Sequence, residues 1–298
     1  MKQSAHHPFR SAKAKEEYLA LYDRQAKQWP VASESKTVET SYGQTFVRIS
    51  GPLGAQPLVL LPGAYGNSLM WIPNIAALSE CYKTYAVDSI YDIGRSVYTR
   101  HLRTSADYVH WLDEFFTALG LGDQILLLGI SLGGWEAAQY ALHCPGRLAR
   151  LVLLAPAGTV LPMRWEFIFR GFLSLLHRHF FRSVLGWVFE DLARKDETSL
   201  KRLKEATEEA FTAVRCFKPK LIPVPTVLKD KELQNLRVAT LCIVGEHEKI
   251  YSAHKAVQRL NRVAPDIQTE IIPQAGHGLT YSQTELVNRR VLEFLKQP

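Results

Sequence analysis

The sequence predicts an α/β protein with a mostly parallel, doubly wound sheet and an inserted helical cap. Short, unbroken apolar runs recur along much of the 298-residue chain, as in strands buried on both faces of a parallel sheet. Helical segments separate these runs, which favours right-handed crossovers. The alternation stops over residues 157–236, where no clear strand is found. A structureless loop of that length is uncommon in a compact domain, so a helical insertion is expected there.

The N-terminal region predicts a helix followed by a hairpin. Residues 13–29 place apolar side chains at helical spacing, and Pro30 ends the pattern. Residues 37–40 and 45–50 then read as two strands, with Gly43 in the turn between them.

The alternating region follows the hairpin and resumes after residue 236. Its predicted strands are residues 58–61, 84–87, 125–129, 151–155, 239–244 and 269–272. Its predicted helices are residues 74–79, 105–119, 132–143 and 253–263.

The break in this rhythm predicts two units. Residues 1–156 and 237–298 are expected to form the α/β core, and residues 157–236 the helical cap. The first half of the cap is aromatic and apolar, and residues 192–211 read as one charged amphipathic helix.

Composition excludes several function classes. The net charge is +7, but Lys and Arg are interspersed with acidic residues and form no dense basic block, so we expect no nucleic-acid partner. The four cysteines lie far apart, which indicates reduced thiols rather than a disulfide framework. The N-terminus lacks an apolar export segment, and charged residues interrupt the aromatic stretch 165–189. We therefore predict a cytoplasmic protein without stable membrane insertion.

The strongest chemical signal is the run Gly129-Ile130-Ser131-Leu132-Gly133. A G-x-S-x-G match alone is weak, but here a buried strand leads into it and a helix follows. This is the setting of a nucleophile on a sharp, strained turn, where glycines two positions away on either side avoid a clash. The run predicts Ser131 as nucleophile. The alternative is a tight turn capped by a serine.

A serine hydroxyl needs a base, and His277 fits that role best. It lies between two glycines just after the last apolar run, at the carboxyl edge of the sheet where Ser131 also lies. Ser282 and Glu285 then form an expected capping box that opens a final helix.

The acid that orients the histidine is expected on the loop after residues 239–244. Glu248 has more freedom to reach His277 than Glu246, which can instead serve as a structural cap or salt-bridge partner. The chain order of serine, acid and histidine is the one expected for this arrangement.

The oxyanion hole needs two backbone amides. Leu132 supplies one, and the loop after residues 58–61 the other. Ala64 is the favoured donor there, ahead of Tyr65. The alternative is a glycine-rich turn without a catalytic role.

Together these residues closely resemble the α/β-hydrolase superfamily, and within it bacterial carboxylesterase-like serine hydrolases with a helical cap. The likeness includes the helix at residues 17–23 before Trp29-Pro30, the segment 68–74, and the loops Gly245–Glu248 and Gly276–Gly278. The resemblance implies a glutamate as acid and a cap that covers the nucleophile. One departure is Pro62, where many members have a histidine that braces the oxyanion loop.

The resemblance also suggests where substrate binds. Tyr65 and Trp71 near the oxyanion loop are candidate binding residues, as are Trp165 and Phe169 of the cap. Other cap aromatics, Phe167, Phe172 and Trp187, are further candidates for the pocket wall. For any single cap aromatic, packing within the cap is the competing interpretation.

The predicted function is hydrolysis of a small or medium apolar carboxylic ester through an acyl-enzyme, with no metal or organic cofactor. The same triad also serves C–C bond hydrolases and perhydrolases. A ligand receptor with slow turnover is a third hypothesis. Cap helices form dimers in some relatives, so a homodimer stays open.

Overall fold

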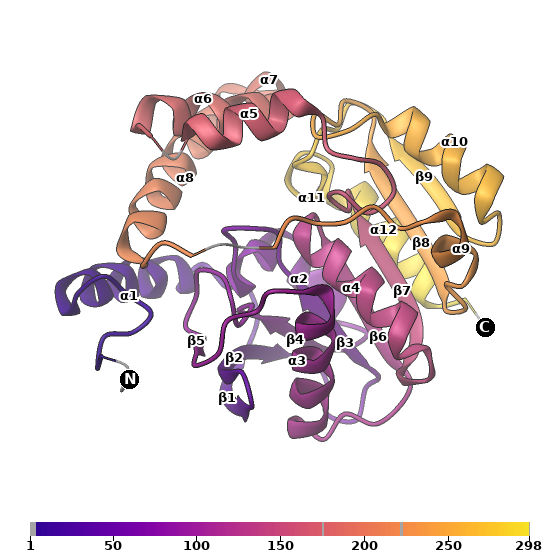
Figure 1. The fold of residues 1–298 in the computed structure, drawn as a ribbon, viewed down its shortest axis with the longest axis horizontal. Helices are drawn as coiled ribbons and strands as arrows, with labels where there is room; N and C mark the ends of the chain where they lie inside the picture. Colours follow the sequence, from indigo (N-terminus) through magenta and orange to yellow (C-terminus); the bar gives the residue numbers. More distant parts are fainter. Residues whose placement is uncertain (1–3, 175, 221–222, 298) are drawn as a thin grey trace.

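The computed structural model describes residues 4–174, 176–220 and 223–297 (Figure 1). Its sheet runs in the order β1-β2-β4-β3-β6-β7-β8-β9, and β5 pairs with β2. Strands β3, β4 and β6–β9 are parallel, whereas the pairings of β2 with β1, β4 and β5 are antiparallel. The strands are β1 Glu34–Thr40, β2 Gly43–Ser50, β3 Pro57–Leu61, β4 Lys83–Val87, β5 Val97–Tyr98, β6 Ile125–Ile130, β7 Leu148–Leu154, β8 Ala239–Gly245 and β9 Gln268–Ile272.

The predicted α/β architecture with a mostly parallel sheet is confirmed. Each apolar run is a strand, and the hairpin forms as expected. Gly43 differs slightly from its prediction, because it is the first residue of β2 and pairs with Thr40, leaving Ser41 and Tyr42 as the turn. Strand β5 has only two residues, too few to produce a recognisable sequence pattern.

Helices flank both faces of this sheet (Figure 1). Their bounds are α1 Ala12–Ala26, α2 Ile72–Ser79, α3 Ser105–Ala118, α4 Leu132–His143, α5 Trp165–Ser174, α6 Arg178–Val188, α7 Glu190–Lys195, α8 Glu197–Cys216, α9 Asp230–Gln234, α10 Ala253–Val263, α11 Leu279–Ser282 and α12 Thr284–Leu295. Two short 3-10 turns, η1 Ser68–Trp71 and η2 Pro145–Arg147, complete the described elements.

The single helix predicted over residues 192–211 is wrong. Helices α7 and α8 are separated at Asp196, whose backbone is extended and whose side chain accepts a hydrogen bond from the Ser199 amide at 2.7 Å. Asp196 is therefore the N-cap of α8. An aspartate side chain can accept a backbone N–H bond that would otherwise continue the helix. The spacing of apolar residues alone does not reveal where this happens.

The predicted capping box at Ser282 is also wrong. Ser282 is the last residue of the short helix α11, and its hydroxyl donates to the Gly278 carbonyl at 3.3 Å. The N-cap of α12 is Gln283, which makes no side-chain cap bond. Ser282 thus belongs to α11, whereas the sequence pattern assigns it to the start of α12.

The core has two layers, one on each face of the sheet. Helices α3, α4 and α10 cover one face, and α2 and α12 cover the other. Strand β6 shows the two-sided burial, because Leu127 packs in the first cluster and Leu126 and Leu128 in the second. This is why the predicted strands are unbroken apolar runs rather than alternating ones.

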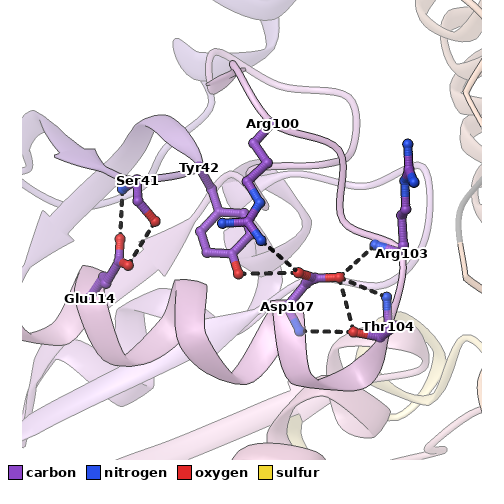
Figure 2. A network of polar contacts seen from close by, with 7 residues as sticks. All are labelled: Ser41, Tyr42, Arg100, Arg103, Thr104, Asp107 and Glu114. Atoms are coloured by element: carbon purple, nitrogen blue, oxygen red, sulfur yellow. Dashed lines mark hydrogen bonds and ion pairs between the residues drawn. The ribbon is translucent and has the colours of Figure 1, made fainter.

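Polar contacts fasten the β1–β2 turn to α3 (Figure 2). Ser41 donates from its amide and its hydroxyl to Glu114, at 2.6 and 2.7 Å. Tyr42 donates to Asp107 at 3.2 Å, and Asp107 also forms a capping box with Thr104 at the start of α3. These contacts hold the antiparallel edge of the sheet against the helix.

Helices α5, α6 and α7 form an arch above the sheet in this view, and α8 descends from it to α1 (Figure 1). Glu209 on α8 accepts from Arg24 at 3.0 Å and from Gln25 at 2.6 Å. Near the end of α8, the ring of Phe217 packs 4.6 Å from that of Phe9. Across the described residues, the length and hydropathy needed to span a membrane do not occur together in any helix.

Candidate active site

Ser131 occupies a strained turn between β6 and α4. Its backbone angles, a φ of 54° and a ψ of −116°, lie in a region that residues other than glycine rarely adopt. A Cβ on Gly129 would overlap the Gly133 carbonyl, and one on Gly133 would overlap the carbonyls of Leu61 and Pro62. Only glycine fits at these two positions, because the backbone segments touch. The strand–turn–helix geometry is the one expected of a nucleophile elbow.

Three side chains from separate loops meet at this turn. The His277 Nε2 atom lies 3.0 Å from Ser131 Oγ, and His277 Nδ1 lies 2.8 Å from Glu248 Oε2. With Nδ1–H donating to the carboxylate, Nε2 accepts the serine proton. The other Glu248 oxygen accepts from the Ile250 amide at 2.8 Å, which fixes the carboxylate. The arrangement matches a nucleophile, a base and an orienting acid.

Burial shapes the electrostatics of this histidine. The side chain of Glu248 is 0% exposed and that of His277 is 8% exposed. Burial by itself lowers the pKa of His277, but the charge and hydrogen bond of Glu248 raise it. The charge of Asp191 adds to this rise, and the net result is a pKa above the ordinary 6.5. Such a histidine is well suited to hold a proton during the reaction.

Glu246, the alternative acid, lies elsewhere. Its Oε2 atom accepts a hydrogen bond from the Gln274 amide at 2.9 Å, and it lies 3.9 Å from His247. Glu246 thus braces the loop before His277, in keeping with the structural role considered for it. In the described part of the chain, the carboxylate that contacts the His277 ring is that of Glu248.

The loop after β3 lies against the nucleophile. A Cβ on Gly63 would be 3.2 Å from the Ser131 Cβ, which shows how closely the loop approaches. The Tyr65 amide donates to Asp92 at 2.9 Å, so it is already occupied. Within the described residues, the amides of Ala64 and Leu132 have no hydrogen-bond acceptor. Ala64 is therefore a better oxyanion donor than Tyr65.

Helix α7 contacts the loop that carries His277, and sequence reasoning missed this contact. Asp191 on α7 accepts from the Gly276 amide at 2.8 Å. The Phe189 ring, just before α7, lies 6.2 Å from the His277 ring between centroids. Both residues lie far from His277 in sequence, and no local motif marks them.

A cavity of about 670 Å³ lies between α7 and the loops after β8 and β9. Its walls are mostly charged, and they include Arg164, Arg194, Lys249, Glu190 and Glu248. Its described lining contains Glu248 but neither Ser131 nor His277. The cavity therefore lies beside Glu248 and does not reach Ser131.

The predicted substrate-binding residues differ in how exposed they are to solvent. Tyr65 is 47% exposed on the oxyanion loop, whereas Trp71 is 1% exposed and packs in the core cluster with Ile75. In the cap, Trp165 and Phe169 are 76% and 53% exposed on α5, with ring centroids 6.2 Å apart. The positions of Tyr65, Trp165 and Phe169 leave them accessible to a ligand, and the burial of Trp71 does not.

Comparisons with known proteins agree with this geometry. A family model described as the alpha/beta hydrolase fold matches residues 56–282. An uncharacterized carboxylesterase, nap, of Bacillus subtilis is 37% identical over 277 residues, covering 93% of this chain and 91% of the relative. Carboxylesterase YbfK of the same organism is 36% identical over 278 residues, covering 93% of each chain.

Solved structures give the same result. The crystal structure of naproxen esterase (carboxylesterase NP) from Bacillus subtilis has a TM-score of 0.86 at 35% sequence identity. The alignment covers 96% of this chain and 99% of that one. The nucleophile elbow, the order of its partners in the chain and these matches lead to one conclusion: the chain belongs to the α/β-hydrolase family.

Proposed function

We propose that this protein is a serine carboxylesterase that hydrolyses small or medium apolar esters. The observation that carries the proposal is the continuous hydrogen-bonded chain from Ser131 through His277 to Glu248, with distances of 3.0 and 2.8 Å. The names of the relatives that are 36–37% identical support ester hydrolysis over the C–C hydrolase and perhydrolase alternatives. Hydrolysis on such a triad needs no metal or organic cofactor.

The first half of the reaction is acylation. Ser131 Oγ attacks the ester carbonyl carbon while His277 Nε2 takes the hydroxyl proton. The negative oxygen that forms is stabilised by the Ala64 and Leu132 amides. His277 then gives its proton to the leaving alcohol as the ester C–O bond breaks, and the acyl group stays on Ser131. Glu248 keeps the ring oriented and stabilises its charged form throughout.

The second half returns the serine. His277 takes a proton from water, and the resulting nucleophile attacks the acyl carbon. The tetrahedral intermediate collapses, Ser131 leaves with the proton from His277, and the carboxylic acid departs. Ester and water are thus converted to acid and alcohol, and the enzyme regains its starting state.

The proposal extends to the organisation of the chain. Residues 157–236 act as a cap over a core formed by residues 1–156 and 237–298. The exposed aromatic face of α5 supports a role for the cap in binding the apolar part of the ester. Cysteines 81, 144, 216 and 242 are all free, which supports a reducing compartment such as the cytoplasm.

The decisive experiment combines labelling with turnover. The pure protein is incubated with a fluorophosphonate, and the modified residue is identified by intact mass and peptide mapping. In parallel, hydrolysis of p-nitrophenyl esters of increasing chain length is followed. Labelling at Ser131 with many turnovers per enzyme is expected. Slow fluorophosphonate labelling, or a p-nitrophenyl ester that leaves Ser131 acylated without turnover, would instead favour the slow ligand receptor.

A further inference from the structure

Asp92 joins two loops beside the nucleophile, although it belongs to no part of the triad. It lies on the loop after β4 and is 3% exposed. Its Oδ2 atom accepts from the Tyr65 amide at 2.9 Å, and its Oδ1 atom accepts from the Ile93 amide at 2.7 Å. Hydrogen bonds to a carboxylate are stronger than those between neutral groups, so the link to Tyr65 is firm.

Tyr65 lies in an unfavourable backbone conformation. The Gly66 amide donates to the Gly63 carbonyl at 3.0 Å, which defines a turn with Ala64 and Tyr65 at its centre. Tyr65 has a φ of 57°, the left-handed value that the third position of a type II turn requires and that glycine normally supplies. A tyrosine holds this conformation only when the surroundings favour it.

The same turn sets the direction of the Ala64 amide. Ala64 lies between Gly63, which packs against Ser131, and Tyr65, which is held by Asp92. Rotation of the peptide between Ala64 and Tyr65 would relieve the left-handed strain by changing φ of Tyr65 together with ψ of Ala64, so the backbone conformation at Ala64 would change with it. An acceptor for the Tyr65 amide opposes that rotation.

We propose that Asp92 is a positioning residue that holds the Ala64 amide in place for the oxyanion hole by anchoring Tyr65 in its left-handed conformation. The inference rests on the proposed function, because it takes the Ala64 amide as an oxyanion donor. In the described part of the chain, the Asp92 carboxylate is hydrogen-bonded to the Tyr65 and Ile93 amides and not to Ser131.

The charge state of Asp92 agrees with this role. Burial raises its pKa to about 6, and the positive charge of Lys220 opposes the rise. The group is therefore a carboxylate at neutral pH. Lys220 also donates to the Asp92 carbonyl at 2.8 Å. Lys220 follows α8, so the segment that returns from the cap helps to fix the same loop.

A purely structural role and a positioning role predict different kinetics. An oxyanion donor acts in the transition state, so its misplacement lowers kcat and leaves KM nearly unchanged. Loss of the Asp92 carboxylate should lower the population of the left-handed conformation at Tyr65 about 5- to 30-fold. We therefore expect Asp92→Ala to lower kcat by a similar factor, about 5- to 30-fold, less than the roughly 100- to 1,000-fold typical when a donor is removed outright.

The test is a double-mutant cycle between Asp92→Ala and Tyr65→Gly. Glycine adopts the left-handed conformation without cost, so the turn no longer needs the anchor. In the Tyr65→Gly background, Asp92→Ala should lower kcat about twofold or less. Asp92→Asn serves where the alanine variant folds poorly. Its single amide oxygen must choose between the Tyr65 and Ile93 amides, so an intermediate loss of kcat is expected.

Asp88 offers a matched control. It is also a buried aspartate after β4, and it accepts from the Ser68 and Arg95 amides, both at 2.8 Å. Its partner Ser68 lies beyond the Gly63–Gly66 turn, so Tyr65→Gly should not relieve the effect of Asp88→Asn. Melting temperatures of all variants separate loss of folding from loss of rate.

The outcomes divide clearly. A lower kcat at constant KM in Asp92→Ala that disappears with Tyr65→Gly supports the inference. A wild-type kcat in Asp92→Ala or Asp92→Asn, or equal losses in both Tyr65 backgrounds, would overturn it while the esterase proposal stands. A wild-type protein that hydrolyses no p-nitrophenyl ester and is not labelled at Ser131 would overturn both.

Discussion

The loops at the carboxyl edge of the sheet and the helix α5 differ in how firmly they are held. At the sheet edge, Ser131, His277 and Glu248 are joined by hydrogen bonds of 2.8–3.0 Å and are backed by close backbone contacts. Helix α5 buries none of its residues, and Trp165 and Phe169 project with large exposed areas. The comparison teaches that the residues proposed for the chemistry are held by many restraints, whereas those proposed for substrate choice lie on a surface with few.

The largest expected effect removes the nucleophile. Ser131→Ala should lower kcat by about 10⁴- to 10⁶-fold, because only binding and the oxyanion hole then remain to assist the reaction. The melting temperature should stay the same or rise, since alanine keeps the packing. Steady-state kinetics on a p-nitrophenyl ester measures the loss. Activity close to that of the wild-type protein would refute the assignment of Ser131 as nucleophile.

The next effect separates the two glutamates of the same loop. Glu248→Gln should lower kcat about 10³- to 10⁴-fold, because the amide no longer stabilises the charged histidine or selects its tautomer. Glu246→Gln is the matched control, and its effect should stay below about tenfold, since it only braces the Gln274 amide. If Glu246→Gln were the more damaging change, the acid would have to be reassigned.

The third prediction concerns the pKa of His277 and its dependence on Asp191, the residue of α7 that contacts the His277 loop. His277 acts as a base only when neutral, so activity is present above its pKa and is lost as the pH falls through it. Because that pKa is raised, the acid limb of kcat/KM should lie above pH 6.5.

Asp191→Asn removes one of the charges that raise the pKa of His277, so the acid limb should move to lower pH. Its kcat at pH 8 should fall less than about tenfold, because the amide can still accept from Gly276. Asp196→Asn, an exposed capping residue of α8, should leave the limb in place. A limb that does not move in Asp191→Asn would show that the cap exerts no electrostatic influence on the base.

The smallest expected effects lie in the cap itself. Trp165→Ala and Phe169→Ala should raise KM for longer acyl esters about two- to tenfold and leave kcat nearly unchanged, because they remove apolar contact area only. Leu53→Ala is the control, since Leu53 is an apolar residue that is 88% exposed and precedes β3, whereas the loop with Ala64 follows that strand. Equal KM values in all three variants would argue that α5 does not face the substrate.

The sequence predicts most of the fold and brings forward Ser131, Glu248 and His277 as candidate reacting residues, because both predictions depend on local patterns. Unbroken apolar runs mark the strands, and glycines two positions before and after Ser131 form a recognisable motif, although the backbone atoms that require them belong to Gly133 and to the end of β3. Asp92 and Asp191 were not predicted as parts of the site, since each acts on a residue that is distant in sequence and meets it only after folding. The breaks at Asp196 and Ser282 depend on which of two neighbouring helices takes a capping side chain, and amphipathic spacing does not decide that.

The contact between α8 and α1 has a mechanical consequence. Arg24 and Gln25 connect the middle of α8 to the N-terminal helix through Glu209, so the proposed cap is held between its ends as well as by the chain itself. The proposed cap therefore has an additional anchoring point on the N-terminal helix and does not turn about a single hinge. Rigid-body swinging of the whole insertion would have to break the Glu209 contacts and separate the Phe9 and Phe217 rings. Entry of a bulky ester is therefore expected to depend on local bending of α5 and α6, and a crosslink between α1 and α8 should leave turnover intact.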